Sequence, residues 1–319
     1  MSKTNLNQKI PLLVIAGPTA VGKSELAMRV AEQLSTEIIS ADSAQVYRHL
    51  NIGTAKPTAE EQIRIKHHLI DLVDPDQSFS VADYQQAANE IIIKLWSAKK
   101  LPLMVGGTGL YIRAVTNAYA FGKSGADYNT RKSYEQDAIK FGLSYLYQKL
   151  QDLDPKTASN IHPNDQKRII RALEVYSLEG KLISEQVSQT RMAESPFKTL
   201  VIGITIDRIA LYERIEKRVE KMLEKGFLEE VRNLRDKGFE ESAPGMQILG
   251  YRQLLAYLGG DEDWEETVAA IKKETRNLAK RQLTWFRREK EIMWIDVKES
   301  LTPEAIAENI CKIVKDLAP

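Results

Sequence analysis

The sequence predicts an α/β fold in which helices flank a parallel sheet and a helical insertion interrupts the chain. Apolar runs typical of buried strands alternate with helical patterns over residues 1–120. A glycine-rich segment joins the first apolar run to the first helical pattern, and strand signals then disappear between residues 122 and 196. Alternating strands and helices are typical of βαβ units, and these units form parallel sheets.

The first elements are a strand, a helix and a second strand. Leu12–Ala16 is a short apolar run of the buried-strand type. Leu26, Val30 and Leu34 recur every four residues, as on one face of a helix. Glu37–Ser40 then predicts the second strand of the sheet.

Another strand, a long helix and a further strand are expected before the insertion. Leu69–Val73 predicts a third strand. Ser80–Lys99 has the pattern of a helix, with Ser80 as its N-cap and Asp83 in the capping-box position. Leu101–Val105 predicts the further strand, and two glycines end it.

The insertion separates two parts of the core. Tyr134–Leu150 and Asp165–Glu179 have helical patterns, so we expect residues 123–197 to form a helical domain and residues 1–122 and 198–319 to form the core. Thr199–Ile206 predicts a strand that returns to the sheet. After Arg208 the chain is mostly helical, apart from a late strand at Ile292–Val297.

Composition and charge narrow the class of protein. The single cysteine, Cys311, excludes a disulfide framework within the chain and fits a reducing cytosol. The sequence contains no run of about 18 apolar residues, which is the length that a membrane span needs. We therefore expect a cytoplasmic protein. The net charge is only +1, but eight basic and two acidic residues between Lys272 and Lys290 give a local charge of +6. Arg276, Lys280 and Arg287 share a helical face there, which favours contact with nucleic acid, although a solvated helix face gives the same pattern.

The glycine-rich segment fits the G-x-x-x-x-G-K-S pattern of a phosphate-binding loop. Its glycines let backbone N–H groups surround an anion, and the following helix N-terminus adds positive potential. The lysine adds a full charge, and the serine hydroxyl can bind Mg²⁺. The pattern therefore predicts a P-loop NTPase-like core that binds a di- or triphosphate. The candidate residues are Gly17, Thr19, Ala20, Gly22, Lys23 and Ser24.

Asp42 follows the second predicted strand, at the edge of a parallel sheet where ligands bind. A carboxylate beside the phosphate loop can accept a proton from an attacking nucleophile. A nucleotide triphosphatase also needs an acid at the end of a core strand, but the strand before Gly106 ends without one. Asp71 and Asp74 follow only a short, interrupted apolar run. The pattern disfavours an ATPase and leaves a small P-loop kinase as an alternative.

Further blocks of residues stand out along the chain after the phosphate loop. They are Asp42–Tyr47, Gly53–Pro57, Gly106–Tyr111, His162–Asp165, Arg168–Val175, Gly250–Tyr251 and Ala279–Phe286. With these blocks the sequence resembles, over nearly its full length, the tRNA dimethylallyltransferases, also called tRNA isopentenyltransferases. The phosphate loop is shared with many enzymes, but the later blocks in this order are specific. The chain resembles the bacterial type, because its single cysteine excludes the zinc finger of the eukaryotic relatives.

The resemblance implies a reaction. Enzymes of this family move a dimethylallyl group from dimethylallyl diphosphate to the exocyclic amine of the adenine just 3′ of the anticodon in certain tRNAs. The phosphate loop then holds the diphosphate, with Mg²⁺ as cofactor. No phosphoryl group moves, which explains the missing acid. An aromatic amine is a poor nucleophile, so a base that takes its proton as the bond forms would help.

The resemblance also implies roles for residues. Asp42 corresponds to the base, Thr108 to a threonine that contacts the target adenosine, and Arg218 to an arginine that helps bind the diphosphate. The insertion would grip the anticodon stem-loop. We expect a monomer with no obligate protein partner, because one tRNA occupies one active site. The positions implied to face tRNA are Asp42, Ser43, Ala44, Gln45, Thr108, Arg131, Gln166, Lys167, Arg168, Ile169, Ile170 and Arg281.

Three alternatives to tRNA prenylation remain at this point. A small-molecule P-loop kinase would use Asp42 as base toward an acceptor hydroxyl, but it leaves the basic cluster and the long insertion unexplained. An isopentenyltransferase that acts on free AMP or ADP would need no insertion that grips RNA. An RNA-binding module with an inactive phosphate site would not need Lys23, Asp42 and Thr108 together.

Overall fold

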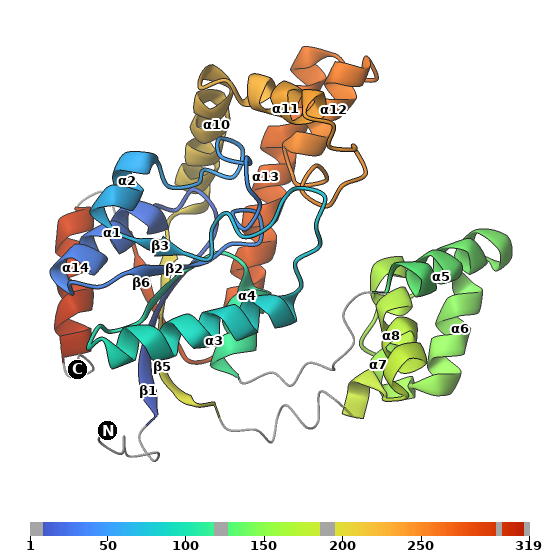
Figure 1. The fold of residues 1–319 in the computed structure, drawn as a ribbon, viewed down its shortest axis with the longest axis horizontal. Coiled ribbons are helices and arrows are strands. Elements are labelled where there is room, and N and C mark those ends of the chain that lie inside the picture. The colour runs from blue at the N-terminus through green and yellow to red at the C-terminus, as the bar shows by residue number, and fades with distance from the viewer. Residues whose placement is uncertain (1–8, 118–126, 186–194, 298–301, 316–319) are drawn as a thin grey trace. The chain divides into compact units, whose positions relative to one another are not determined.

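The computed structural model describes residues 9–117, 127–185, 195–297 and 302–315 (Figure 1). In these residues one six-stranded sheet has the order β3-β2-β4-β1-β5-β6, and every neighbouring pair is parallel. The expected α/β class is therefore confirmed. The strands are β1 (Ile10–Ala16), β2 (Ile38–Ala41), β3 (His67–His68), β4 (Leu103–Gly106), β5 (Phe197–Thr205) and β6 (Ile292–Asp296).

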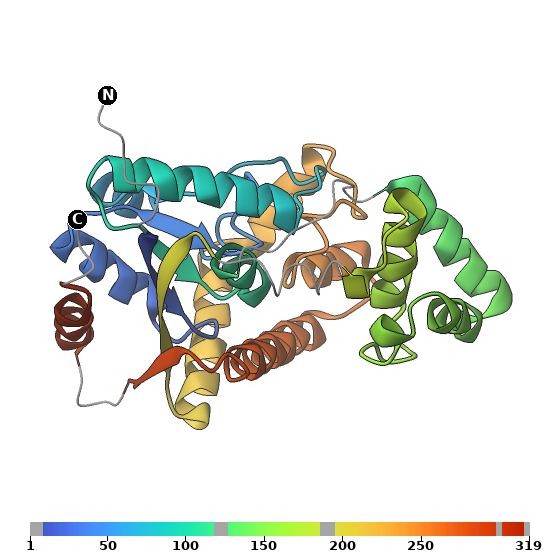
Figure 2. The same ribbon diagram turned by 90° about the horizontal axis from the view of Figure 1, so that it is seen from below.

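Helices cover both faces of the sheet. The α3 helix lies on one face, and α1, α10 and α14 contribute to a core on the other (Figure 2). Alternating side chains of β1 explain the two layers: Leu13 and Ile15 enter that core, whereas Leu12 and Val14 point to the opposite face. The helices around the sheet are α1 (Lys23–Gln33), α2 (Ala59–Arg64), α3 (Val81–Ser97), α4 (Gly109–Thr116), α10 (Arg208–Glu224), α11 (Phe227–Asp236), α12 (Tyr251–Gly259), α13 (Trp264–Phe286) and α14 (Pro303–Val314).

The chain divides into two compact units, Met1–Ile112 with Pro196–Pro319, and Arg113–Ser195. The second unit contains α5 (Tyr128–Phe141), α6 (Leu143–Leu153), α7 (Pro155–Ala158) and α8 (Gln166–Glu179) around its own apolar core. The expected boundary at residues 122 and 123 lies outside the described residues. At the other expected boundary, Phe197 is the first residue of β5.

The structure corrects two elements of the sequence analysis. Leu69–Val73 is not a strand, because Leu69 and Asp71 have φ angles of 62° and 54°, which extended backbone does not allow. The short strand is β3, and Val73 makes only an isolated bridge to Tyr47. The helix expected over residues 134–150 is two helices, because Gly142, with φ of 85°, ends α5 and begins α6.

Other local signals are confirmed. Ser80 caps α3, and its reciprocal hydrogen bonds with Asp83 complete the expected capping box. The late strand occurs as β6, beside β5. Among the helices that the structure describes, none combines the length and apolar character that a bilayer crossing requires.

Candidate active site

Strand register brings the predicted phosphate and acid segments to one edge of the sheet. Gly106, the last residue of β4, pairs with Ala16 of β1 on one side and with Ala41 of β2 on the other. The chain therefore leaves the sheet at neighbouring points into the phosphate loop, Asp42 and Gly107. This edge follows the carboxyl ends of parallel strands, where α/β proteins bind ligands.

The phosphate loop needs its glycines at two points. A Cβ on Gly17 would lie 2.6 Å from the carbonyl oxygen of Ile204, so only glycine fits beside β5. Gly22 has φ of 104° and forms the left-handed N-cap of α1. Among the described residues, no side chain caps the first N–H groups of α1, which leaves them available to an anion.

Two cations converge on this loop. The pKa of Lys23 is lowered to about 7, chiefly by burial and also by the Arg218 guanidinium, while Asp42 opposes the decrease. Burial also lowers the pKa of Arg218, which Asp42 raises. Lys23 Nζ donates a hydrogen bond of 2.6 Å to the Pro18 carbonyl. Two close cations that share one carboxylate gain from an additional anion such as a diphosphate.

Asp42 and Thr108 lie in loops that are hydrogen-bonded to each other. Asp42 Oδ1 accepts from the Ala44 N–H at 2.9 Å. The Ser43 N–H donates to Thr108 Oγ1 at 3.0 Å, and the Thr108 N–H donates to the Ala41 carbonyl at 3.1 Å. A Cβ on Gly106 would lie 2.1 Å from that carbonyl oxygen, so the first glycine allows the close approach of the two loops.

A pair of stacked tyrosines lies near Asp42. The rings of Tyr84 and Tyr111 are 3.9 Å apart, and the Tyr84 hydroxyl donates to the Ser40 carbonyl at 3.0 Å. Burial raises the pKa of both hydroxyls, and the Asp42 carboxylate contributes to the increase. Both tyrosines therefore stay neutral at ordinary pH, and the pair supports the end of β2 from which Asp42 projects.

The Gln45 side chain is occupied inside the protein. Its Oε1 accepts from the Ser40 hydroxyl at 3.0 Å, and its Nε2 donates to the carbonyls of Thr54 and Ala55 at 3.3 Å each. The amide thus links the start of the Asp42 loop to the Gly53–Pro57 block. Any RNA contact at Gln45 would have to use its backbone or compete with these bonds.

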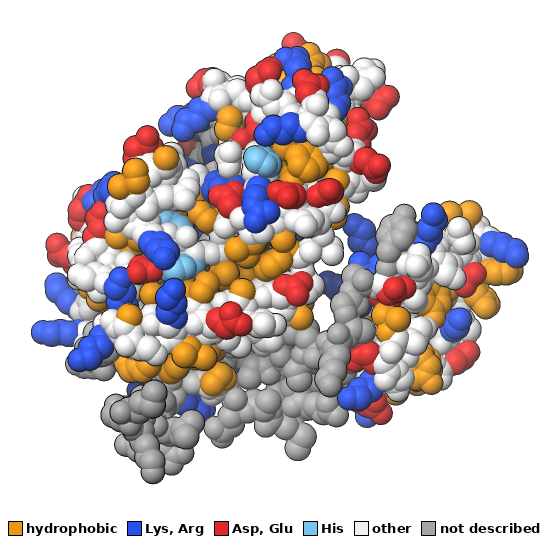
Figure 3. All heavy atoms as spheres, viewed as in Figure 1, with side chains coloured by type: hydrophobic (Ala, Val, Ile, Leu, Met, Phe, Trp, Pro, Cys, Tyr) orange, Lys and Arg blue, Asp and Glu red, His pale blue; other side chains and the backbone are white. Residues whose placement is uncertain are grey.

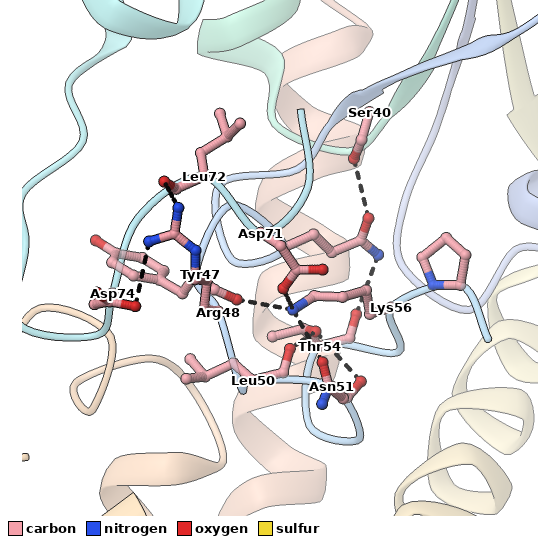
Figure 4. Close-up of polar contacts among 12 residues, drawn as sticks. Ser40, Tyr47, Arg48, Leu50, Asn51, Thr54, Lys56, Asp71, Leu72 and Asp74 are labelled. Carbon is pink, nitrogen blue, oxygen red and sulfur yellow. Dashed lines mark hydrogen bonds and ion pairs between the residues drawn. The ribbon is translucent and has the colours of Figure 1, made fainter. Parts of the chain in front are cut away.

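A buried lysine holds the same loop from the inside (Figure 4). Only 3% of the Lys56 side chain is exposed. Its Nζ donates to the Tyr47 carbonyl at 2.8 Å, Asn51 Oδ1 at 3.1 Å and Asp71 Oδ1 at 2.6 Å. Burial lowers the pKa of Lys56, and Asp71 opposes the decrease. Asp71 therefore serves this ion pair, and Asp74 pairs with Arg48 at 3.3 Å, so both candidate acids have structural partners.

Glu230 of α11 fastens the outer part of the loop. Its carboxylate accepts from the backbone N–H groups of Asn51, Ile52 and Gly53 at 2.8–3.2 Å. It also accepts from the Tyr251 hydroxyl at 2.5 Å. A Cβ on Gly53 would overlap the rings of Phe227 and Tyr251. These contacts give the Gly53–Pro57 block a physical role, which is to anchor the loop that begins at Asp42.

The candidate residues of the second unit occupy different environments. Arg131 pairs with the buried Glu174 at 2.9 Å, and Arg171 pairs with the same carboxylate. Gln166, Lys167 and Arg168 are exposed in the first turn of α8, whose N-cap is Asp165. The side chains of Ile169 and Ile170 are buried in the core of the unit. An RNA contact at the two isoleucines would therefore rely on the backbone.

The basic cluster on α13 is only partly free. Arg276 pairs with Glu216 at 2.7 Å and Lys272 with Glu220 at 2.6 Å, so these two cations bind α13 to α10. Lys280 and Arg281 are exposed, as are Arg287 and Arg288. Of the three cations expected to share a face, Arg276 therefore pairs with α10, whereas Lys280 and Arg287 are exposed.

Sequence reasoning missed Gln282 as a site residue. Its Oε1 accepts from the Thr19 N–H at 2.8 Å, and its Nε2 donates to the Gly107 carbonyl at 3.1 Å. One amide thus connects the phosphate loop to the turn that carries Thr108. Gln282 lies in the Ala279–Phe286 block of the family resemblance, but that block assigned a site role only to Arg281, and the sequence gives no sign of the two contacts.

Comparisons with known proteins agree on one family. The family model described as IPP transferase matches residues 45–289. The chain is 48% identical over 306 residues to the tRNA dimethylallyltransferase of Pelotomaculum thermopropionicum, covering 96% of this chain and 97% of that protein. It is 50% identical over 289 residues to tRNA dimethylallyltransferase 2 of Syntrophus aciditrophicus, covering 91% and 93%.

Solved structures show the same similarity. The full-length tRNA isopentenylpyrophosphate transferase from Bacillus halodurans is 40% identical with a TM-score of 0.71, and the match covers 97% of this chain and 98% of that chain. A eukaryotic dimethylallyltransferase acting on tRNA is 27% identical with a TM-score of 0.81. That match covers 96% of this chain and 79% of the other.

Proposed function

The chain belongs to the IPP transferase family and is a tRNA dimethylallyltransferase, and we propose that the residues at the carboxyl edge of its sheet carry the reaction. The reaction joins C1 of the dimethylallyl group to the exocyclic nitrogen of the adenine 3′ of the anticodon. The bond from C1 to the diphosphate oxygen breaks, the nitrogen loses a proton, and diphosphate leaves.

The phosphate loop binds the diphosphate of the donor in this proposal. The uncapped N-terminus of α1, the backbone of Gly17–Ser24 and the charges of Lys23 and Arg218 surround the anion. Negative charge develops on the diphosphate as the carbon–oxygen bond breaks, and fixed positive groups stabilise it. The two cations therefore lower the barrier as well as binding the donor.

The residues present also fit Mg²⁺. The Ser24 hydroxyl stands in the first turn of α1, and Asp42 follows β2, which β4 separates from β1 at the same edge of the sheet. Within the described residues, no group of three His, Cys, Asp or Glu side chains could hold a metal. That donor set suits a hard cation that takes most of its ligands from phosphate oxygens and water. Bound there through Ser24, Mg²⁺ would neutralise diphosphate charge.

Asp42 takes the proton of the attacking amine. It is a half-buried carboxylate at the same sheet edge as the phosphate loop, and its charge acts on both Lys23 and Arg218. Its Oδ1 accepts from the Ala44 N–H, which fixes the direction of the carboxylate. The juxtaposition of this acid with an anion site that has two cations is the observation that carries the proposal.

Thr108 contacts the adenosine that reacts. The adenine is stacked in the anticodon loop and must be extruded, at a cost of a few kcal/mol. The Thr108 hydroxyl, held by the Ser43 loop, supplies a hydrogen-bonding group where the nucleoside enters. Contacts of this kind offset the cost of unstacking and place the amine against Asp42.

The second unit provides the grip on the anticodon stem-loop. The first turn of α8 exposes Gln166, Lys167 and Arg168, and its two cations suit an RNA phosphate, while the Asp165 carboxylate caps the helix and pairs with Arg168 at 3.4 Å. In the first unit, Arg281 and the exposed cations beside it on α13 add backbone contacts. We also propose that the enzyme acts in the cytoplasm as a monomer with one bound tRNA.

The experiment is to incubate the protein with unmodified tRNA, dimethylallyl diphosphate and Mg²⁺, and to analyse the digested RNA by mass spectrometry. We expect adenosine with one added dimethylallyl group, and no such product from free AMP. Modification of AMP instead of tRNA would favour the free-nucleotide isopentenyltransferase. Consumption of ATP with a small acceptor, without either product, would favour the kinase.

A further inference from the structure

Gln282 is the one side chain in the described residues that joins the phosphate loop to the turn that carries Thr108. The phosphate loop holds the prenyl donor in the proposed function, and Thr108 contacts the acceptor adenosine. The distance between the two loops therefore affects the distance between the reacting carbon and nitrogen. A group that fixes this separation acts on the reaction without touching either substrate.

The fit between Gln282 and the turn is close. A Cβ on Gly107 would lie 2.4 Å from Gln282 Nε2. Trp285 follows Gln282 by about one helical turn. A Cβ on Gly109 would lie 2.2 Å from the Trp285 ring, so Gly109 makes room for that ring. Two glycines of the Gly106–Tyr111 block thus make room for side chains of α13. The helix and the turn have complementary shapes as well as a hydrogen bond.

The same stretch of α13 has an opposite, exposed face. Ala279 and Phe286 are buried and Gln282 is half-buried, whereas Lys280, Arg281 and Thr284 are exposed. The exposed cations are the ones expected to contact tRNA. If bound RNA shifts α13, the shift acts on the phosphate loop through the Gln282 hydrogen bond to Thr19, because a helix moves as a stiff unit.

We propose that Gln282 is a positioning residue for prenyl transfer, whose side-chain amide sets the separation between the phosphate loop and the Gly107–Thr108 turn. The inference rests on the proposed function. Its amide has both a donor and an acceptor, and each faces a complementary backbone group. The Thr19 N–H donates to Gln282 Oε1, and Gln282 Nε2 donates to the Gly107 carbonyl.

Substitutions can separate the two hydrogen bonds. Gln282→Glu keeps an acceptor for the Thr19 N–H but places a carboxylate oxygen against the Gly107 carbonyl, which repels it. Gln282→Ala removes both bonds. Gln86 is exposed on α3 and donates to Glu90 at 3.2 Å, so Gln86→Glu and Gln86→Ala make the same chemical changes away from the site.

The test measures kcat, the KM for donor and tRNA, the Kd for tRNA and the melting temperature of each variant. We expect kcat to fall by about tenfold to hundredfold in both Gln282 variants, because a misplacement near 1 Å can cost that much. The Kd for tRNA should stay within about threefold of the wild type. The Gln86 variants should match the wild type in every quantity.

Three results would overturn the inference. Unchanged kcat in both Gln282 variants would show that the separation is set by other groups. A Kd for tRNA that rises in step with the lost activity would make Gln282 an RNA contact. A melting temperature that falls below the assay temperature would assign the loss to folding. Failure of the wild-type protein to prenylate tRNA would instead contradict the proposed function itself.

Discussion

At the scale of single residues, the site depends on charges that proteins rarely leave so close together. Burial disfavours the charged state of both Lys23 and Arg218, the Arg218 guanidinium adds to this effect on Lys23, and Asp42 opposes it at both residues. The arrangement costs the empty protein some stability and favours binding of an anion. Binding and titration are therefore coupled at this point.

The first prediction concerns proton uptake by Lys23. In the free enzyme its pKa is lowered to about 7, so the ammonium loses its proton as pH rises above that value. A bound diphosphate favours the charged form and raises the pKa, so the enzyme must take up a proton on binding. Above about pH 7, the Kd for the donor should rise by up to about tenfold per pH unit.

Calorimetric titration in two buffers of different ionisation enthalpy measures this uptake directly. Above about pH 7 the donor itself takes up and releases no protons on binding, because its diphosphate is already ionised. Lys23→Arg keeps a charge that does not titrate in this range, so its proton uptake should vanish. Equal binding enthalpies of the wild-type enzyme in both buffers would contradict the lowered pKa of Lys23.

At the scale of elements, the loop after β2 has no regular secondary structure yet is held tightly. Lys56 fastens it from within, and Glu230 fastens it to α11. Gln45 joins its two ends. This loop carries Asp42, so in the proposed mechanism its order is a condition for placing the base.

The second prediction tests the Lys56 contact. Lys56→Ala leaves the Tyr47 carbonyl, the Asn51 amide oxygen and the Asp71 carboxylate without their common donor. We expect a loss of stability of about 1–3 kcal/mol, measured by urea unfolding, together with a lower kcat. Lys66→Ala, at an exposed position between α2 and β3, is the control and should leave both unchanged. A Lys56→Ala variant as stable as the wild type would contradict a stabilising role for the Lys56 hydrogen bonds.

The elements also show what the sequence could and could not predict. Strands β1, β2, β4 and β5 followed from apolar runs, and α3 followed from its capping box, because these signals are local. The short strand β3 was misplaced, since the left-handed backbone at Leu69 and Asp71 is not visible in an apolar pattern. The break at Gly142 was missed because the helical period continues across it.

The candidate site likewise contains residues that a local pattern predicts and residues that it does not. Glycines and the lysine of a phosphate loop are recognised by their spacing, and Asp42 by its place after a strand. Gln282 reaches Gly107 and Thr19 across 175 and 263 residues of sequence, and Glu230 reaches Asn51, Ile52 and Gly53 across 177 to 179, so no local pattern predicts these contacts. The buried ion pair of Lys56 was equally hidden, because a lysine in a loop is most often exposed.

At the scale of the whole molecule, acidic and basic residues nearly balance, and the largest local surplus of positive charge lies between Lys272 and Lys290. The face seen in Figure 3 mixes acidic and basic side chains and shows no broad basic area on the sheet unit. The net charge is +1. The cations proposed to bind RNA are local groups, namely the first turn of α8 and the exposed Lys280 and Arg281 of α13.

The third prediction concerns the salt dependence of tRNA binding. The logarithm of the binding constant should fall linearly with the logarithm of salt concentration. Lys167→Ala and Arg168→Ala should each weaken binding and reduce that slope by about one. Lys94→Ala, an exposed lysine on α3, should leave the slope unchanged. A slope that is the same in all three variants would exclude the first turn of α8 from the RNA contact.

The central claim is that one edge of the sheet joins a diphosphate site to a base for the adenine amine. Single-turnover prenylation by Asp42→Asn, with donor and tRNA saturating, tests it most directly. Asparagine keeps the size and an acceptor for the Ala44 N–H but cannot take the proton. The account predicts a rate lower by about 10²- to 10⁴-fold with unchanged tRNA affinity. A rate near that of the wild type would contradict it.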